Sequence, residues 1–209
     1  MTIEIFKPNE DPFGISYEDH VKNFWKHTCS LPKNNSPARR NNDGQIDEIA
    51  NQNSDSPVFY LNISCDGEDS LMERTCKVPK GKGIFIPAIS VEVSEKEVQD
   101  PSIDKLKKLA KEDQDSVKDL SVKLDGIEVN DIRSYRIPTN EFELNFPQNA
   151  LFDVSAGKCQ AVADGFYLIT KPPSLGTHVI EFKGNLENDK EESLDKKYSV
   201  NIKYTLEVQ

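Results

Sequence analysis

The segment YSVNIKYTLEV, residues 198–208, decides the fold class of this chain. Apolar and polar side chains alternate along its whole length. Tyr198, Ile202 and Val208 belong to the apolar set, whereas Lys203 and Glu207 belong to the polar set. Successive side chains of a strand point to opposite faces of a sheet. The segment therefore predicts a β-strand that buries one face and exposes the other.

Strand-like segments with turn signals between them occur through much of the chain. Residues 122–124 and 127–129 flank Asp125-Gly126, which is typical of a hairpin closed by a two-residue turn. Only two segments have convincing helical spacing. This pattern predicts a mainly β fold, an antiparallel β-sandwich or jelly roll with two peripheral α-helices. The other strand-like segments are 57–63, 83–93, 142–146, 159–169 and 178–182.

Two of these segments have special features. Residues 58–63 are continuously apolar except for Asn62, which predicts a central strand covered on both faces. In residues 83–93 the apolar positions change parity at Pro87-Ala88. Such a change predicts a β-bulge, at which the strand bends.

The two predicted helices lie before and between the strands. Residues 16–28 begin with Ser16 and Asp19, which resemble a capping box, and apolar residues follow at helical spacing. The second helix is predicted over residues 101–120, with Asp100 as its N-cap and Pro101 in its first turn. We expect each helix to dock an apolar stripe on the core.

The length of 209 residues fits one β-sandwich-like domain over residues 1–209. Residues 31–56 are rich in Asn, Asp, Ser and Pro and have no apolar period, which predicts a long irregular segment. Residues 187–197 are rich in Asp, Glu and Lys and predict a long loop before the last strand.

The formal net charge of −10 repels phosphate backbones, so we expect no nucleic-acid partner. The apolar stretches have the length of strands, so we expect no membrane span. Residues 1–14 lack the basic and apolar regions of a secretory signal. The chain is therefore either not exported or the mature form of an exported precursor.

The four cysteines are Cys29, Cys65, Cys76 and Cys159, and none of them forms a C-x-x-C motif. Disulfides are favoured over a zinc ribbon. Cys65 and Cys76 are the candidate pair, because the turn-rich residues 66–70 separate two strand-like runs that this turn could fold onto each other. A bridge closing so short a loop contributes about 3 kcal/mol. Four buried thiols in a reducing compartment remain the alternative.

The sequence predicts no catalytic residues, no metal site and no cofactor. His20 and His27 are expected on the surface of the first helix. His178 alternates with apolar residues, which favours a structural hydrogen bond over catalysis. Asp43 and Asp47 lie in a segment similar to the middle of an EF-hand loop. An Asx-rich turn is the preferred interpretation there, and a calcium contact is the alternative.

The run 52–61 and the run RTCKVPKGKGIFIP, residues 74–87, resemble an uncharacterised family of mostly exported archaeal and bacterial proteins. Members of that family tend to carry a further cysteine shortly before Gln52, which this chain lacks. The resemblance implies a β-sandwich-like fold with a disulfide hairpin and an extracytoplasmic setting, and it implies no catalytic residues. It continues through residues 124–126, 135–136, 163–167 and 176–178.

Taken together, these features favour a non-enzymatic extracytoplasmic binding or structural module, with loops on the sandwich forming the contact surface. Its partner would be a carbohydrate or another protein. Two alternatives remain: a carbohydrate-active hydrolase that uses Asp or Glu carboxylates, and a calcium-stabilised surface protein.

Overall fold

The computed structural model describes residues 3–39, 44–52, 55–63, 70–189 and 197–209. Its helices are η1 (Pro12–Gly14), α1 (Tyr17–Ser30), η2 (Lys33–Asn35), α2 (Gly44–Gln52), α3 (Ile103–Asp115) and η3 (Ile132–Tyr135). Its strands are β1 (Val58–Tyr60), β2 (Met72–Val78), β3 (Gly83–Ser94), β4 (Val117–Leu124), β5 (Ile127–Glu128), β6 (Phe142–Phe146), β7 (Gly157–Ile169), β8 (Gly176–Glu187) and β9 (Lys197–Val208).

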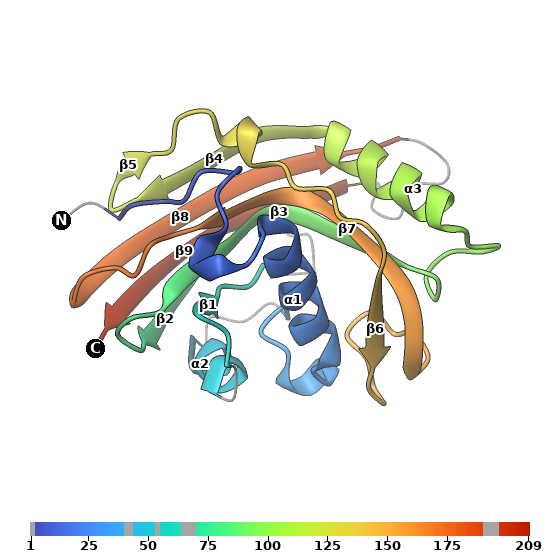
Figure 1. Cartoon of the computed structure of the whole chain (residues 1–209), viewed down its shortest axis with the longest axis horizontal. Coiled ribbons are helices and arrows are strands. Elements are labelled where there is room, and N and C mark those ends of the chain that lie inside the picture. The colour runs from blue at the N-terminus through green and yellow to red at the C-terminus, as the bar shows by residue number, and fades with distance from the viewer. Residues whose placement is uncertain (1–2, 40–43, 53–54, 64–69, 190–196) are drawn as a thin grey trace.

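The strands form two sheets, which confirms the predicted sandwich-like fold. One sheet has the order β1-β3-β7-β6 and the other has the order β2-β9-β8-β4-β5. Figure 1 shows the strands as an arch with α1 and α2 beneath it and α3 above one end. The pairs β1/β3 and β2/β9 are parallel and the other pairs are antiparallel, so both sheets are mixed.

Strand β9 occupies the second position of the five-stranded sheet and has the predicted alternation. Tyr198, Ile202, Tyr204 and the other apolar residues of the strand are buried in the main core, whereas Glu207 is exposed. The predicted hairpin at Asp125-Gly126 is also present, between β4 and β5. Positive φ angles of 49° at Asp125 and 78° at Gly126 are those of the primed turn that suits a two-residue hairpin.

Strand β3 contains the predicted bulge, because its register with β7 shifts between Pro87 and Ile89. All twelve residues of β3 are buried. Beyond the bulge, Val91 and Val93 pack in a separate apolar cluster with α3. Glu92, on the opposite face of the strand, lies against Cys29 of α1. Strand β3 therefore packs against α3 on one face and against α1 on the other.

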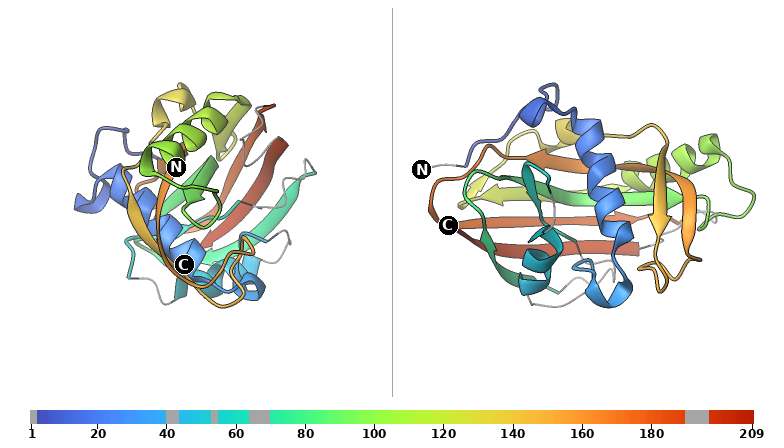
Figure 2. Two further views of the ribbon diagram at one scale, coloured as in Figure 1. Left: turned by 90° about the vertical axis from the view of Figure 1, so that its right-hand side faces the viewer. Right: turned by 60° about the horizontal axis from the view of Figure 1, so that its bottom comes forward.

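Helix α1 begins as predicted, because the Ser16 side chain accepts the Asp19 N–H at 3.1 Å. The right-hand view of Figure 2 shows α1 crossing the strands of the four-stranded sheet. The Phe24 ring stacks on Phe85 with centroids 4.9 Å apart, and Trp25 Nε1 donates to Tyr167 Oη at 3.0 Å. None of the helices in the described ranges has the length and apolar character needed to cross a bilayer.

The second predicted helix is too long. Helix α3 spans Ile103–Asp115, and residues 117–124 form strand β4. The apolar spacing continued into the strand, where Val117 pairs with Leu186. Ser102, and not Asp100, is the N-cap, since its side chain accepts the Lys105 N–H. Asp100 has a left-handed φ of 49°.

Two expectations about the first half of the chain are wrong. Residues 31–56 are not all irregular, because they contain η2 and α2. Strand β1 is fully buried but stands at the edge of its sheet, not at the centre. Its outer edge is covered by Asn51 of α2, which bonds to the backbone N–H and C=O of Tyr60.

The strand-like segment 159–169 is confirmed as part of β7, which runs through Asp164-Gly165 without a break. Gly165 lies opposite Ser90 of β3, and a Cβ atom there would lie 2.3 Å from the Ser90 Cβ and 2.8 Å from the Ile89 carbonyl oxygen. Only glycine allows the backbones to approach this closely.

We expect Gly165→Ala to lower the free energy of unfolding by about 1–3 kcal/mol, because the methyl group overpacks a rigid backbone contact. Urea unfolding measures the change. Gly184→Ala in β8 is the matched control, since its nearest neighbours would be side-chain atoms 3.4 Å away. Equal losses for the two variants would contradict this interpretation.

Candidate functional site

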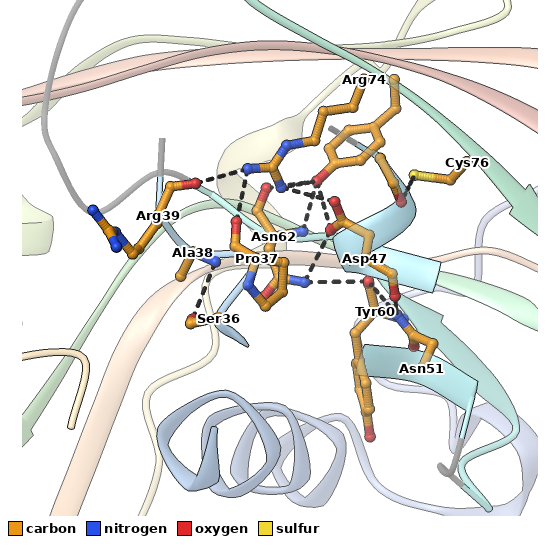
Figure 3. A network of polar contacts seen from close by, with 12 residues as sticks. Ser36, Pro37, Ala38, Arg39, Asp47, Asn51, Tyr60, Asn62, Arg74 and Cys76 are labelled. Atoms are coloured by element: carbon orange, nitrogen blue, oxygen red, sulfur yellow. Dashed lines mark hydrogen bonds and ion pairs between the residues drawn. The ribbon is translucent and has the colours of Figure 1, made fainter. Parts of the chain in front are cut away.

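The most completely buried polar centre is an ion pair between Arg74 of β2 and Asp47 of α2. Arg74 Nη1 lies 2.9 Å from Asp47 Oδ2, and both side chains have 0% exposure. Figure 3 shows how the surrounding groups converge on the pair. Two charges removed from water in this way hold each other in place, since either alone would be strongly destabilising.

Arg74 also donates hydrogen bonds to two other segments. Its Nη2 donates to the carbonyl oxygens of Pro37 at 2.7 Å and Arg39 at 3.0 Å. Its Nη1 also donates to Tyr204 Oη of β9 at 2.9 Å. These contacts tie β2, β9, α2 and the segment after η2 to one guanidinium group. We call this set the Arg74 clamp.

Asp47 is equally enclosed. Its Oδ1 accepts hydrogen bonds from Tyr204 Oη at 3.0 Å and from Asn62 Nδ2 at 3.2 Å. Burial raises the pKa of Asp47 to about 6, against the opposing effect of the Arg74 charge. The carboxyl is therefore ionised at neutral pH. Because solvent does not reach it, the Arg74 clamp is a structural centre and not a reaction site.

Asp47 is not free for the calcium contact that was considered for Asp43 and Asp47. Both Asp47 carboxylate oxygens are occupied by Arg74, Tyr204 and Asn62, and Asp43 lies outside the described residues. Across the described ranges, no group of three or more His, Cys, Asp or Glu side chains could hold a metal ion.

We expect Arg74→Met to lower the free energy of unfolding by about 3–5 kcal/mol, because it leaves a buried carboxylate without its counter-charge. Chemical denaturation at neutral pH measures this loss. Lys77→Met, at an exposed position of the same strand, should have little effect. A loss below about 1 kcal/mol for Arg74→Met would show that the pair is dispensable.

A second buried acid, Glu92, lies beneath α1. Its Oε2 is 3.9 Å from Cys29 Sγ, and its Oε1 has no hydrogen-bond partner in the part of the chain that the structure describes. Burial raises the pKa of Glu92 well above the ordinary value, and the charge of Glu97 adds to this effect. Burial therefore favours the neutral form of this carboxyl group.

No disulfide joins any two of the described cysteines, which are Cys29, Cys76 and Cys159. The candidate pair Cys65–Cys76 stays a prediction. The Cys76 Sγ lies 3.4 Å from the Gly44 carbonyl oxygen. The proposed partner of Cys76, Cys65, lies outside the described residues. The two strands that were expected to fold onto each other, β1 and β2, belong to different sheets.

The raised pKa of Glu92 predicts a pH dependence of stability. The unfolded chain loses this proton near pH 4.5, the ordinary value for glutamate, and the folded protein loses it only at a higher pH, so stability falls as the pH rises from the first value to the second. Glu92→Gln needs no proton. We expect it to unfold with a flatter pH profile and to gain at least about 1 kcal/mol at pH 8.

Thermal or urea unfolding between about pH 5 and pH 8 tests this expectation. The control is Glu128→Gln on the exposed strand β5, which should leave the profile unchanged. A profile for Glu92→Gln as steep as that of the parent protein would contradict the assignment of a neutral carboxyl.

The histidines serve the fold. The predicted structural hydrogen bond of His178 is confirmed, since its Nδ1 lies 2.8 Å from Asp125 Oδ2 and its Nε2 lies 3.0 Å from the Ser174 carbonyl oxygen. The Ser174 hydroxyl is also near, at 3.3 Å. The donor and acceptor roles of the two ring nitrogens depend on the tautomer, because a neutral imidazole has one donor and one acceptor nitrogen.

The expectation of surface positions for His20 and His27 is wrong. His20 is 1% exposed, and its Nε2 lies 2.9 Å from the Pro12 carbonyl oxygen. His27 is half-buried and its ring stacks on Tyr60 at 5.3 Å. Burial lowers the pKa of both imidazoles.

A pocket of about 430 Å³ lies between α3, the segment 136–140 and β7. We call it the α3 pocket. Its volume falls in the range of small-molecule sites, and it combines an apolar surface with a few polar groups. The apolar residues of its lining are Ala110, Pro138, Val162 and Ala163, and the polar residues are Lys107, Lys111, Arg136, Thr139, Asn140 and Asp164.

Arg136 holds the walls of the α3 pocket together. Its Nε and Nη2 bind Asp164 of β7 at 3.0 and 2.7 Å in a two-pronged pair. Its Nη1 binds Asp115 of α3 at 2.6 Å, and its Nη2 also donates to the Lys111 carbonyl oxygen. Such a planar fork fixes the relative positions of the groups that it joins. The pocket is therefore preformed.

Two other cavities are less suited to a specific ligand. The α2 groove, about 680 Å³, is mostly polar, and two of its three acids are engaged: Glu48 accepts the Lys77 N–H at 2.7 Å and Glu73 binds Lys203 at 3.1 Å. A cavity of about 500 Å³ near residues 171–174 is bounded by His178, which is committed to its structural bonds.

The sequence contained no motif for the α3 pocket, because its lining comes from three distant segments. Comparison of the chain with protein-family models, with curated proteins and with solved structures finds no match. The assignment of a site therefore rests on geometry and chemistry alone.

Proposed function

We propose that this protein is a non-enzymatic binding module and that the α3 pocket is its ligand site. The observation that carries this proposal is a preformed cavity whose apolar surface is bordered by polar groups and braced by the Arg136–Asp164 ion pair. Proteins bind small molecules in cavities of this size and composition.

The pairing of the titratable groups in the lining supports binding over catalysis. Burial raises the pKa of Asp164, and the Arg136 charge opposes that rise. A general base or nucleophile needs a free electron pair directed at its substrate. The Asp164 oxygens are instead 3.0 and 2.7 Å from Arg136 nitrogens.

The carbohydrate-active hydrolase is the second candidate, because three acids, Glu48, Glu73 and Glu207, line the α2 groove. A glycosidase would need two of them on either side of a sugar bond. Hydrolysis of a panel of glycans, lost in Glu73→Gln, would favour this candidate over the binding module. The extracytoplasmic setting remains a prediction that rests on the family resemblance.

A fragment screen by thermal shift tests the proposed site. We expect small apolar ligands to raise the melting temperature, because ligands that bind only the folded state stabilise it. Pro138→Trp should abolish these shifts by filling the pocket from an exposed position whose residue has no backbone N–H to lose. Shifts that persist in Pro138→Trp, or a screen without any binder, would contradict the proposal.

A further inference from the structure

The cations bordering the α3 pocket differ in how firmly they are held. Arg136 is fixed by Asp164 and Asp115, and Lys111 binds Asp115 at 2.6 Å. Among the described residues, Lys107 has only long polar contacts: its Nζ lies 3.4 Å from Asn140 Oδ1 and 3.7 Å from Glu141 Oε2.

These distances show that Lys107 is available to a ligand. Both are longer than a good hydrogen bond between these groups. The side chains of Lys107 and Glu141 are 41% and 52% exposed, and an exposed pair of this kind is worth about 0–1 kcal/mol. Turning the ammonium group toward a bound anion would therefore cost little.

A second donor comes from Thr139, which lines the pocket and is 5% exposed. Its hydroxyl oxygen accepts the Ala163 N–H at 2.9 Å. A hydroxyl group also has one hydrogen to donate, and no acceptor for it is found among the described residues. An oxygen atom of a ligand would complete this bond.

The apolar residues of the lining favour a ligand with an apolar part. Ala110 and Val162 are 2% and 1% exposed and belong to the apolar cluster beneath α3. Pro138 adds a third apolar side chain to the lining. Asp115 and Asp164 would repel a second negative charge, because they lie close to the same site. A ligand with one anionic group and an uncharged apolar remainder fits this distribution of charge.

From these contacts we infer that the α3 pocket binds a small monocarboxylate with an apolar body, an inference that rests on the proposed function. The carboxylate accepts hydrogen bonds from the Lys107 ammonium and the Thr139 hydroxyl. The apolar body packs on Ala110, Pro138 and Val162.

Paired probes test this inference. NMR would follow the titration of isotope-labelled protein with phenylacetate or hexanoate and, separately, with their uncharged amides, phenylacetamide and hexanamide. We expect the carboxylates to shift the amide signals of Val162 and Ala163 and to bind about tenfold more tightly than the amides, because a hydrogen bond to a charged group is stronger than one between neutral groups.

Four variants locate the head group. Lys107→Met should weaken the carboxylates about tenfold and leave the amides unchanged. Lys108→Met, one residue along the same helix and exposed, should change neither. Thr139→Val should weaken carboxylate binding, whereas Thr139→Ser, which keeps the hydroxyl, should retain it. NMR spectra of each variant show directly whether it is folded.

Equal affinities for acids and amides, both blocked by Pro138→Trp, would overturn the inference and leave the proposed binding function intact. Equal weakening of the carboxylates by Lys107→Met and Lys108→Met would overturn it in the same way. If neither class binds, or if Pro138→Trp leaves binding unchanged, the inference fails together with the assignment of the α3 pocket as the ligand site.

Discussion

The buried guanidinium of Arg74 is the constraint on which one half of this structure depends. A dehydrated arginine must find its counter-charge and hydrogen-bond acceptors within the protein. Arg74 finds them in Asp47, Tyr204 and the carbonyl groups of Pro37 and Arg39. The clamp thus orders segments that have little apolar periodicity of their own and brings α2 onto the sheet edge.

The other half of the structure depends on the bulge in β3. The bulge lies between Pro87 and Ile89, and beyond it Val91 and Val93 pack with α3. The segment 136–140 then follows the edge of β7, where the Thr139 N–H bonds to the Ala163 carbonyl oxygen. Helix, segment and strand do not close completely, and the space that they leave is the α3 pocket.

Two arginines therefore have different roles in the two halves. Arg74 has a fully buried side chain, whereas the side chain of Arg136 is 25% exposed. Hydrogen bonds with Asp164 raise the pKa of Arg136 above its already high ordinary value, so it stays charged at any relevant pH. Arg74 stabilises the fold, and Arg136 gives the pocket a rigid wall without closing it.

The features that could be predicted from the sequence are local. The alternation of β9, the turn at Asp125-Gly126, the bulge at Pro87 and the cap at Ser16 each depend on neighbouring residues. The end of α3 was missed because apolar spacing runs on into β4, where side chains face the core for a different reason. Long-range features left no comparable signal. The Arg74 clamp joins residues from 37 to 204, and the lining of the α3 pocket becomes contiguous only after the sheets have formed.

Native-state hydrogen exchange of the backbone amides tests the role of the Arg74 clamp most directly. If the clamp unites α2 with the sheets, the amides of Glu48–Gln52 in α2 should open with the same free energy as those of β9, as parts of one cooperative unit. Exchange in α2 at the rate of an unstructured peptide, while β9 remains protected, would contradict this account.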